Sequence, residues 1–177
     1  MRRAAAHRQD VWSYDFVMDQ TEDGRRLKML PVVDELTREC FTIEVARSLT
    51  AQDVIVALDK LFKAHGASRY LRSDNGSEFI ARAVKEWLAA SGVRTLYIEP
   101  GAPWQNAYSE SFNSRLRDEL LDRELFTSVT EAKVLVEEYR CSYNTERPHS
   151  SLGYQTPAAF RIAAQQKLTS SVSQVGL

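Results

Sequence analysis

The sequence predicts an α/β fold in which helices flank a mixed five-stranded sheet. Three segments with strand character come first, and helical and strand-like segments then alternate along the rest of the chain. This order is typical of helices packed against a sheet whose strands run in both directions. The 177 residues suffice for one domain with a substantial core, and 44% apolar and 27% charged residues are ordinary globular values.

The three N-terminal strands are expected to follow one another through short turns. An apolar and aromatic run predicts the first strand at 11–18, and the polar, glycine-containing segment 20–26 predicts a hairpin turn after it. The returning strand is expected at 27–34, and β-branched residues predict a third strand at 40–46. Pro31 cannot donate to a β-ladder, so we expect an edge position, a bulge or a kink there.

The middle of the chain alternates helices and strands, and capping residues mark the helix ends. Thr50 is expected to cap an amphipathic helix that Gly66 ends. Ser77 is expected to start a second helix, which Gly92 ends. Short strands are expected on either side of the second helix, at 69–72 and 93–98.

Helical spacing resumes twice in the C-terminal part, at 106–121 and at 130–143, and Thr130 is the expected cap of the later helix. The end of the chain is rich in Ser and Gln, which is typical of a frayed terminus. We therefore expect three regions: an N-terminal extension at 1–10, a core domain at 11–160 and a flexible C-terminal tail at 161–177.

Composition excludes several classes of protein. No run of 18 uninterrupted apolar residues occurs, and the basic N-terminus lacks the apolar segment of a signal peptide. Cys40 and Cys141 lie far apart without metal-ligand spacing, so we expect two reduced thiols. These features predict a cytoplasmic protein with no membrane partner.

Net charge limits what the chain can bind alone. The 23 basic and 24 acidic side chains give a formal charge of −1. A self-sufficient DNA-binding protein usually carries a clear basic excess. If the ligand is DNA, much of the affinity is therefore expected to come from another region or another protein.

Three acidic residues stand where a metal-dependent phosphoryl-transfer site would need them. Asp15 interrupts an apolar strand, Asp74 follows a short strand that breaks into a glycine turn, and Glu110 lies early in a helix. A charged carboxylate in an apolar strand is costly unless a partner or a metal compensates it. Three carboxylates from separate elements could share that compensation through divalent cations.

Each of these acids also has a structural interpretation. Asp19 and Asp34 compete with Asp15 for the role in the strand. Asp74 precedes Asn-Gly, and acids are common in such turns. Any acid early in a helix, as Glu110 is, is favoured by the helix dipole.

Spacing and motifs select between these interpretations, since 35 residues separate Asp74 from Glu110 and Arg117 follows Glu110 by seven. In these features the chain resembles the catalytic core of insertion-element transposases related to retroviral integrases. In that family two aspartates and a glutamate bind the metals with this spacing, and a Lys or Arg follows at this distance. The resemblance extends over further motifs, at 102–106, 110–112, 143–149 and 152–157.

The resemblance implies a ribonuclease H-like fold, with 11–160 as an integrase-like catalytic core. It also implies that Asp15, Asp74 and Glu110 bind the metals, and these hard oxygen ligands fit two Mg²⁺ or Mn²⁺ ions better than zinc. We hypothesise that Asp15 bridges both ions, that Asp74 completes one site and that Glu110 completes the other. The reaction would be in-line attack on a DNA phosphodiester, first by water and then by the freed 3′-hydroxyl.

Five residues are candidate DNA contacts: Arg117, Asn113, Trp104, Gln105 and Asn106. Arg117 lies two helical turns beyond Glu110 on the same face, where it could clamp a phosphate. Alternatively it is a solvated side chain paired with Asp118 or Glu119. Trp104 either contacts DNA or staples its loop to the core. The triplet 147–149 is interpreted as a structural lock that returns the chain to the core.

These features predict a transposase or integrase core that acts on element ends and target DNA as a homo-oligomer. Relatives carry a helix-turn-helix region upstream, whereas about ten residues precede the first strand here. We therefore expect a core fragment, a truncated copy or one product of a split frame, inactive alone or aided by a separate helix-turn-helix protein. The alternative is a catalytically silent remnant that binds DNA or full-length transposase and regulates it. A general ribonuclease H-type nuclease fits the motifs less well.

Overall fold

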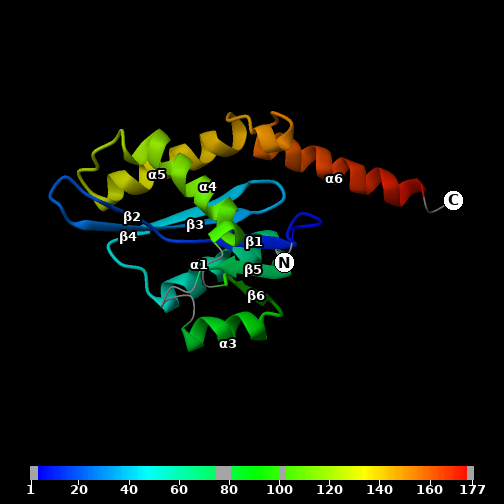
Figure 1. Ribbon diagram of the computed structural model, residues 1–177, viewed down its shortest axis with the longest axis horizontal. Helices are drawn as coiled ribbons and strands as arrows, with labels where there is room; N and C mark the ends of the chain where they lie inside the picture. Colours follow the sequence, from blue (N-terminus) through cyan, green and yellow to red (C-terminus); the bar gives the residue numbers. More distant parts are fainter. Residues whose placement is uncertain (1–3, 75–80, 100–102, 175–177) are drawn as a thin grey trace.

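The computed structural model describes residues 4–74, 81–99 and 103–174. Its described strands form one mixed sheet (Figure 1). The central strand β3 pairs antiparallel with β1, β2 and β4, whereas β1, β5 and β6 run parallel to one another. The strands are β1 (Val11–Tyr14), β2 (Val17–Gln20), β3 (Arg26–Asp34), β4 (Cys40–Ala46), β5 (Tyr70–Ser73) and β6 (Arg94–Tyr97).

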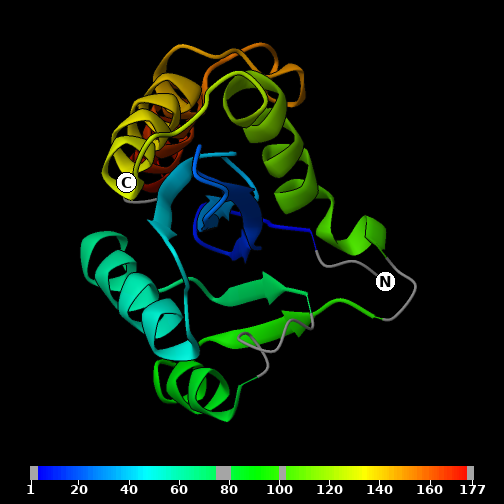
Figure 2. The ribbon, with the colours of Figure 1, turned by 90° about the vertical axis from the view of Figure 1, so that its left-hand side faces the viewer.

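Helices cover both faces of this sheet (Figure 2). The α-helices are α1 (Ala51–His65), α3 (Arg82–Ala90), α4 (Ala107–Leu116), α5 (Val129–Thr145) and α6 (Pro157–Gln174). Shorter turns are the 3₁₀-helices η1 (Pro103–Asn106) and η3 (Ser150–Leu152) and the π-helix η2 (Arg117–Leu121). One apolar cluster joins α1 and α3 to the sheet, and a second joins α4, η2 and α5 to its other face.

The strand expected at 11–18 is divided at the position of its carboxylate. β1 ends at Tyr14 and β2 begins at Val17, although both pair with β3. The register on either side places Asp15 opposite Pro31, which has no N–H to donate to the ladder. The N–H of Phe16 donates instead to Asp15 Oδ1 at 2.8 Å. The proline thus accounts for a break in pairing where the acid emerges.

Two expectations about this sheet need correction. An edge position for Pro31 is wrong, because β3 is interior, with β4 on one side and β1 and β2 on the other. The irregularity that proline predicts is present, since the register against β4 shifts between Val32 and Val33. The described part of the sheet has six strands, but β1 and β2 share one position, so it is five strands wide.

Helix caps follow the expected chemistry, with one exception. Thr50 accepts from the N–H of Asp53 in a capping box at the start of α1, and Gly66 follows its end with φ of 84°. Thr130 is not the cap of α5. Ser128 fills that role and accepts from the N–H of Glu131 at 3.1 Å. The Ser-x-x-Glu pattern at 128–131 is a capping signature that sits two residues before the predicted cap.

Much of the segment expected to be a flexible tail is helical. α6 crosses the predicted boundary at residue 160 and extends away from the body of the molecule (Figure 1). Thr156 Oγ1 accepts from the N–H of Ala159 at 3.2 Å, and Arg161 Nε lies 3.3 Å from Glu39 Oε1, which anchors the first turns. Ala and Gln, frequent at 157–166, are good helix formers. The predicted helix start at Ser77 lies outside the described residues.

Both cysteines are free thiols, Cys40 buried and Cys141 exposed, as expected. Within the described ranges, no helix combines the length and the apolar composition that crossing a bilayer requires.

Candidate active site

The three predicted acids come from elements that meet at one edge of the sheet. Asp15 follows β1 and Asp74 follows β5, and these strands are parallel neighbours, so their carboxyl ends lie side by side. Glu110 lies in the first turn of α4, which packs against β1 and β3. Residues separated by up to 95 positions in the sequence are therefore brought to the same edge of the sheet.

The pKa of Asp15 is affected by the two other acids. Burial raises the pKa of Asp15 to about 6, together with the nearby negative charges of Asp74 and Glu110. The Phe16 N–H and the Asn106 amide, which stabilise the anion, oppose part of that rise. The three carboxylates thus lie within electrostatic range of one another, and their mutual repulsion is the kind that a divalent cation relieves.

The donor set fits a hard divalent cation in charge and in chemistry, because carboxylate oxygens are the ligands that Mg²⁺ and Mn²⁺ prefer. In the part of the chain that the structure describes, no three His, Cys, Asp or Glu side chains are gathered closely enough to hold one ion in common. Asp15, Asp74 and Glu110 are therefore neighbours that would have to draw closer to share a metal.

One face of the α4 segment points at Asp15. Asn106, Glu110, Asn113 and Arg117 are spaced by four, three and four residues, which is one helical stripe. Asn106 Nδ2 lies 3.3 Å and Asn113 Nδ2 lies 3.5 Å from Asp15 Oδ2. Both asparagines were predicted from sequence as DNA contacts, and their partner in the structure is a carboxylate. The stripe spacing is the sequence signal that would have placed them there.

Arg117 and Glu110 line the same groove, as their spacing predicts. This groove of about 440 Å³ lies between α4 and the start of β2, and Phe16, Met18 and Asn113 also line it. Arg117 Nη2 donates to the carbonyl of Met18 at 3.0 Å. Its carboxylate neighbour is Asp122 at 3.9 Å, rather than either residue expected from sequence.

The loop before α4 separates an exposed aromatic from a buried amide. Trp104 is 63% exposed, which is not the burial of a residue that staples a loop to the core. Gln105 is buried, and its amide accepts from the Glu99 N–H at 3.0 Å and donates to the Glu99 carboxylate at 3.2 Å. Gln105 therefore braces the loop, and Trp104 presents its ring to the surroundings.

Asp34, one alternative to Asp15, has a structural role. It is fully buried and its carboxylate accepts from the backbone N–H groups of Gln9, Leu36 and Thr37 at 2.8–3.0 Å. These bonds organise the turn after β3, at the opposite end of β1 from Asp15.

The triplet 147–149 locks the C-terminal part, as its interpretation proposed. Arg147 Nε donates to both carboxylate oxygens of Glu119, at 2.8 and 3.0 Å, which ties the end of α5 to η2. His149 is 2% exposed and packs edge-to-face on Tyr143. Burial, together with the positive charges of three neighbouring arginines, lowers the pKa of His149 to about 4, so the ring is neutral at pH 7.

Comparison with known protein families shows which family this chain belongs to. Family descriptions named integrase core domain match residues 5–103 and residues 91–157. The chain belongs to the integrase core domain family. A 31.7 kDa protein of insertion element IS407 from Burkholderia multivorans is 42% identical over 160 residues, which cover 90% of this chain and 57% of the relative. A 39.2 kDa protein of IS476 from Xanthomonas euvesicatoria is 45% identical over 151 residues, covering 85% and 44%.

A third relative is named as a transposase, that of insertion sequence element IS904 from Lactococcus lactis. It is 28% identical over 156 residues, covering 85% of this chain and 60% of the relative. This integrase core chain spans about half the length of the insertion-element relatives it matches.

Solved structures confirm the ribonuclease H-like fold. The HTLV-2 integrase catalytic core domain, solved with magnesium in a dimeric form, superimposes with a TM-score of 0.67 at 13% identity, covering 88% of this chain and 98% of that one. A chain of the simian T-cell lymphotropic virus intasome gives a TM-score of 0.76 at 13% identity, covering 91% and 57%.

Proposed function

We propose that this chain is the catalytic core of an insertion-element transposase, which cuts and joins DNA strands by metal-dependent phosphoryl transfer. The observation that carries the proposal is the convergence of Asp15, Asp74 and Glu110 at one edge of an integrase-type sheet, where the pKa of Asp15 responds to the other two charges. Membership of the integrase core domain family and the identity with insertion-element proteins support the same reaction class.

The metal would be two Mg²⁺ or Mn²⁺ ions held by Asp15, Asp74 and Glu110. When bound, such ions activate the attacking oxygen and stabilise the departing one. The retroviral integrase core that this fold resembles was solved with magnesium, which supports the choice of ion. The amides of Asn106 and Asn113 hold the Asp15 carboxylate in orientation, and their two contacts restrict its rotation.

The substrate would be a DNA phosphodiester at an element end. Water attacks the phosphorus and the 3′-oxygen leaves; the freed 3′-hydroxyl then attacks a target phosphodiester, from which another 3′-oxygen departs. Arg117 lies in the groove beside Glu110, where its guanidinium can pair with a backbone phosphate. The exposed ring of Trp104 offers a stacking surface for a base.

Joining two element ends requires more than one copy of the core, so we propose a homo-oligomer. The retroviral relatives in the solved structures are a dimer, a trimer and an intasome. A helix-turn-helix region, carried in the same full-length protein or by a separate one, would supply sequence-specific binding to the ends. The net charge of −1 favours an arrangement in which much of the DNA affinity comes from that region rather than from this core.

The decisive experiment is Mn²⁺-dependent strand rejoining on a branched DNA, which is the reversal of integration. This reaction depends least on any further DNA-binding region. We expect rejoining by the wild type and a loss on the order of 10²-fold or more in Asp74→Asn, because the variant binds more weakly the cation that stabilises the negatively charged transition state. Asp59→Asn is the matched control, since Asp59 is a surface acid on α1 paired with Lys63.

Metal binding is measured separately by thermal unfolding with and without Mn²⁺. The ion should raise the Tm of the wild type, and Asp74→Asn should lose most of that rise. Equal shifts in the two proteins would exclude Asp74 as a ligand. A wild type that binds Mn²⁺ but rejoins nothing would identify the catalytically silent remnant instead.

A further inference from the structure

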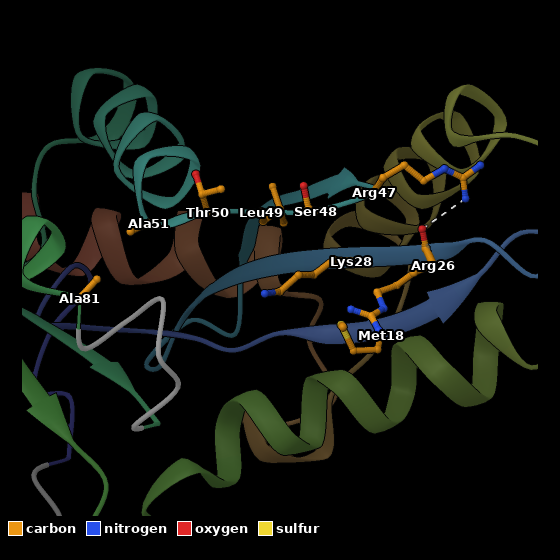
Figure 3. A pocket seen from close by; sticks show the side chains of 9 residues that line it. All are labelled: Met18, Arg26, Lys28, Arg47, Ser48, Leu49, Thr50, Ala51 and Ala81. Carbon is orange, nitrogen blue, oxygen red and sulfur yellow. Dashed lines mark hydrogen bonds between the residues drawn. The ribbon is translucent and has the colours of Figure 1, made fainter.

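A second pocket, lined by basic side chains, lies on the α1 face of the sheet (Figure 3). Its volume is about 460 Å³, and it is bounded by β2, β3, the connection from β4 to α1, and the residue before α3. Arg26, Lys28 and Arg47 line it, and no acidic residue is among its described lining residues. In a chain of net charge −1, three cations around one hollow are a strong local concentration.

The β-register explains why two of these cations lie together. Lys28 is paired with Met18, and Arg26 is paired with Gln20, so both basic side chains stand on the same face of β3. Residues two apart on a strand are separated by about 7 Å. Figure 3 shows the Arg26 and Lys28 side chains on the same side of β3, with Met18 of β2 next to Arg26.

The three cations are held in place by different contacts. Lys28 Nζ lies 3.8 Å from the centroid of the Phe16 ring, a cation–π contact next to Asp15. Arg47 Nη1 donates to Thr21 Oγ1 at 2.6 Å and to the carbonyls of Arg25 and Arg26, which fixes it at the rim. At the N-terminus of α1 the capping box uses the N–H groups of Thr50 and Asp53, so these two donors are not available to a ligand.

The basic pocket is continuous with the groove that holds Glu110 and Arg117. Met18 lines both, and Phe16, which lines the groove, carries Lys28 on its ring. Arg117 binds the Met18 carbonyl, and Lys28 is paired with Met18 from β3, so the two basic sites approach each other at this residue. Met18 is three residues beyond Asp15, and cations therefore line both faces of the sheet close to the Asp15 carboxylate.

We propose that Arg26 and Lys28 form a phosphate-binding site for the DNA backbone, on the opposite face of the sheet from the helix end that carries Arg117. The inference rests on the proposed function, because it assumes that DNA crosses the carboxylates. Arg26 and Lys28 contact neighbouring phosphates of one strand, and Arg47 adds positive potential at the rim. Contacts of this kind carry no sequence information, so the site positions any strand in register with the carboxylates.

The test measures binding of the branched DNA as a function of salt. Each phosphate contact contributes about 0.9 to the slope of log K against log salt for duplex DNA. Lys28→Gln and Arg26→Gln should each lower the slope by about that amount and weaken binding at 0.1 M salt by roughly five- to tenfold. Lys28→Arg, which keeps the charge, should restore the slope.

Lys133→Gln is the matched control, because Lys133 is exposed on α5, which packs on the other face of the sheet. Its slope should equal that of the wild type. Arg26 is also exposed, so Arg26→Gln leaves the core intact even if Lys28→Gln disturbs packing on Phe16. An unchanged slope in Arg26→Gln, or an equal fall in Lys133→Gln, overturns the proposal.

The phosphates could belong to the element end or to the target, and modified substrates distinguish these sources. Uncharged methylphosphonate linkages replace the phosphates near the junction in one arm at a time. The effect of Lys28→Gln should disappear in the form that lacks the contacted phosphates, and that form names the source. An undiminished effect in both forms contradicts a backbone contact.

Binding slopes and strand rejoining separate the two proposals. A wild type that rejoins DNA while its slope is insensitive to Arg26 and Lys28 removes the phosphate site alone. A slope that falls as expected in a protein without rejoining activity keeps the phosphate site and removes the catalytic proposal.

Discussion

The surroundings of Asp15 depend on distant parts of the chain. Its identity as a candidate was predictable, because one acid in an apolar run is conspicuous. Its surroundings were not, because Pro31 lies opposite it through strand register and Asn113 reaches it from a helix nearly one hundred residues away. Local sequence patterns specify elements, and the partners of a side chain follow only from how those elements pack.

Asp15→Asn should stabilise the metal-free protein at neutral pH. The folded-state pKa of Asp15 is raised from 3.8 to about 6, so the folded protein holds a proton between these values that the unfolded chain has lost. Stability in the wild type therefore falls as pH rises through this window, by up to about 3 kcal/mol. Asparagine carries no charge and keeps an acceptor for the Phe16 N–H.

Urea unfolding at pH 7.5 and at pH 4 in metal-free buffer measures this effect. The variant should gain stability over the wild type at pH 7.5, and the gain should be nearly absent at pH 4. Asp59→Asn on the surface of α1 serves as the control for a general change in charge. A gain that is the same at both pH values would show that the raised pKa of Asp15 is not its cause.

Among the elements, strands and capped helices were predicted best, and the irregular turns worst. The segment expected as one helix at 106–121 comprises η1, α4 and the π-helix η2. The π-turn has a packing reason, because it brings the adjacent Leu120 and Leu121 into the same buried cluster as Leu116. A search for the 3.6-residue period of an α-helix cannot predict a π-turn, because the π-turn departs from that period.

The two candidate caps of α5 give a direct test at this scale. Ser128→Ala should lower the free energy of unfolding by about 1 kcal/mol, because the Glu131 N–H loses its acceptor. Thr130→Ala, two residues on and exposed, should change it by less than about 0.5 kcal/mol. Chemical denaturation of both variants measures the difference, and the reverse order would restore the cap predicted from sequence.

At the scale of the molecule, the sequence predicted an α/β domain but understated its electrostatics. A net charge of −1 describes a balanced total, whereas the fold brings three carboxylates to one edge of the sheet and three basic side chains to a pocket on its α1 face. Arg26 and Lys28 are two residues apart on β3, whereas Arg47 is about twenty residues further along the chain, and the antiparallel pairing of β3 with β4 brings it to them. Composition gives the total charge and could not reveal this arrangement.

The two thiols give a probe of global opening. Cys141 is exposed, whereas Cys40 is buried in β4 and burial raises the pKa of its thiol far above the usual range. A thiol reagent at pH 8 should therefore modify one equivalent rapidly in the native protein and the second only as the protein unfolds. Cys141→Ser should remove the fast phase alone. Two fast equivalents in the wild type would contradict a closed core around β4.

The contact between Asn144 and Cys40 has a consequence for how the protein is made. Asn144 accepts from the Cys40 N–H at 2.9 Å and donates to its carbonyl at 2.8 Å, so α5 completes the backbone bonding of an early strand. On the ribosome, β4 is made about one hundred residues before its partner arrives. A chain released early would lack this closure, so a prematurely terminated product is a poor candidate for a working nuclease in the cell.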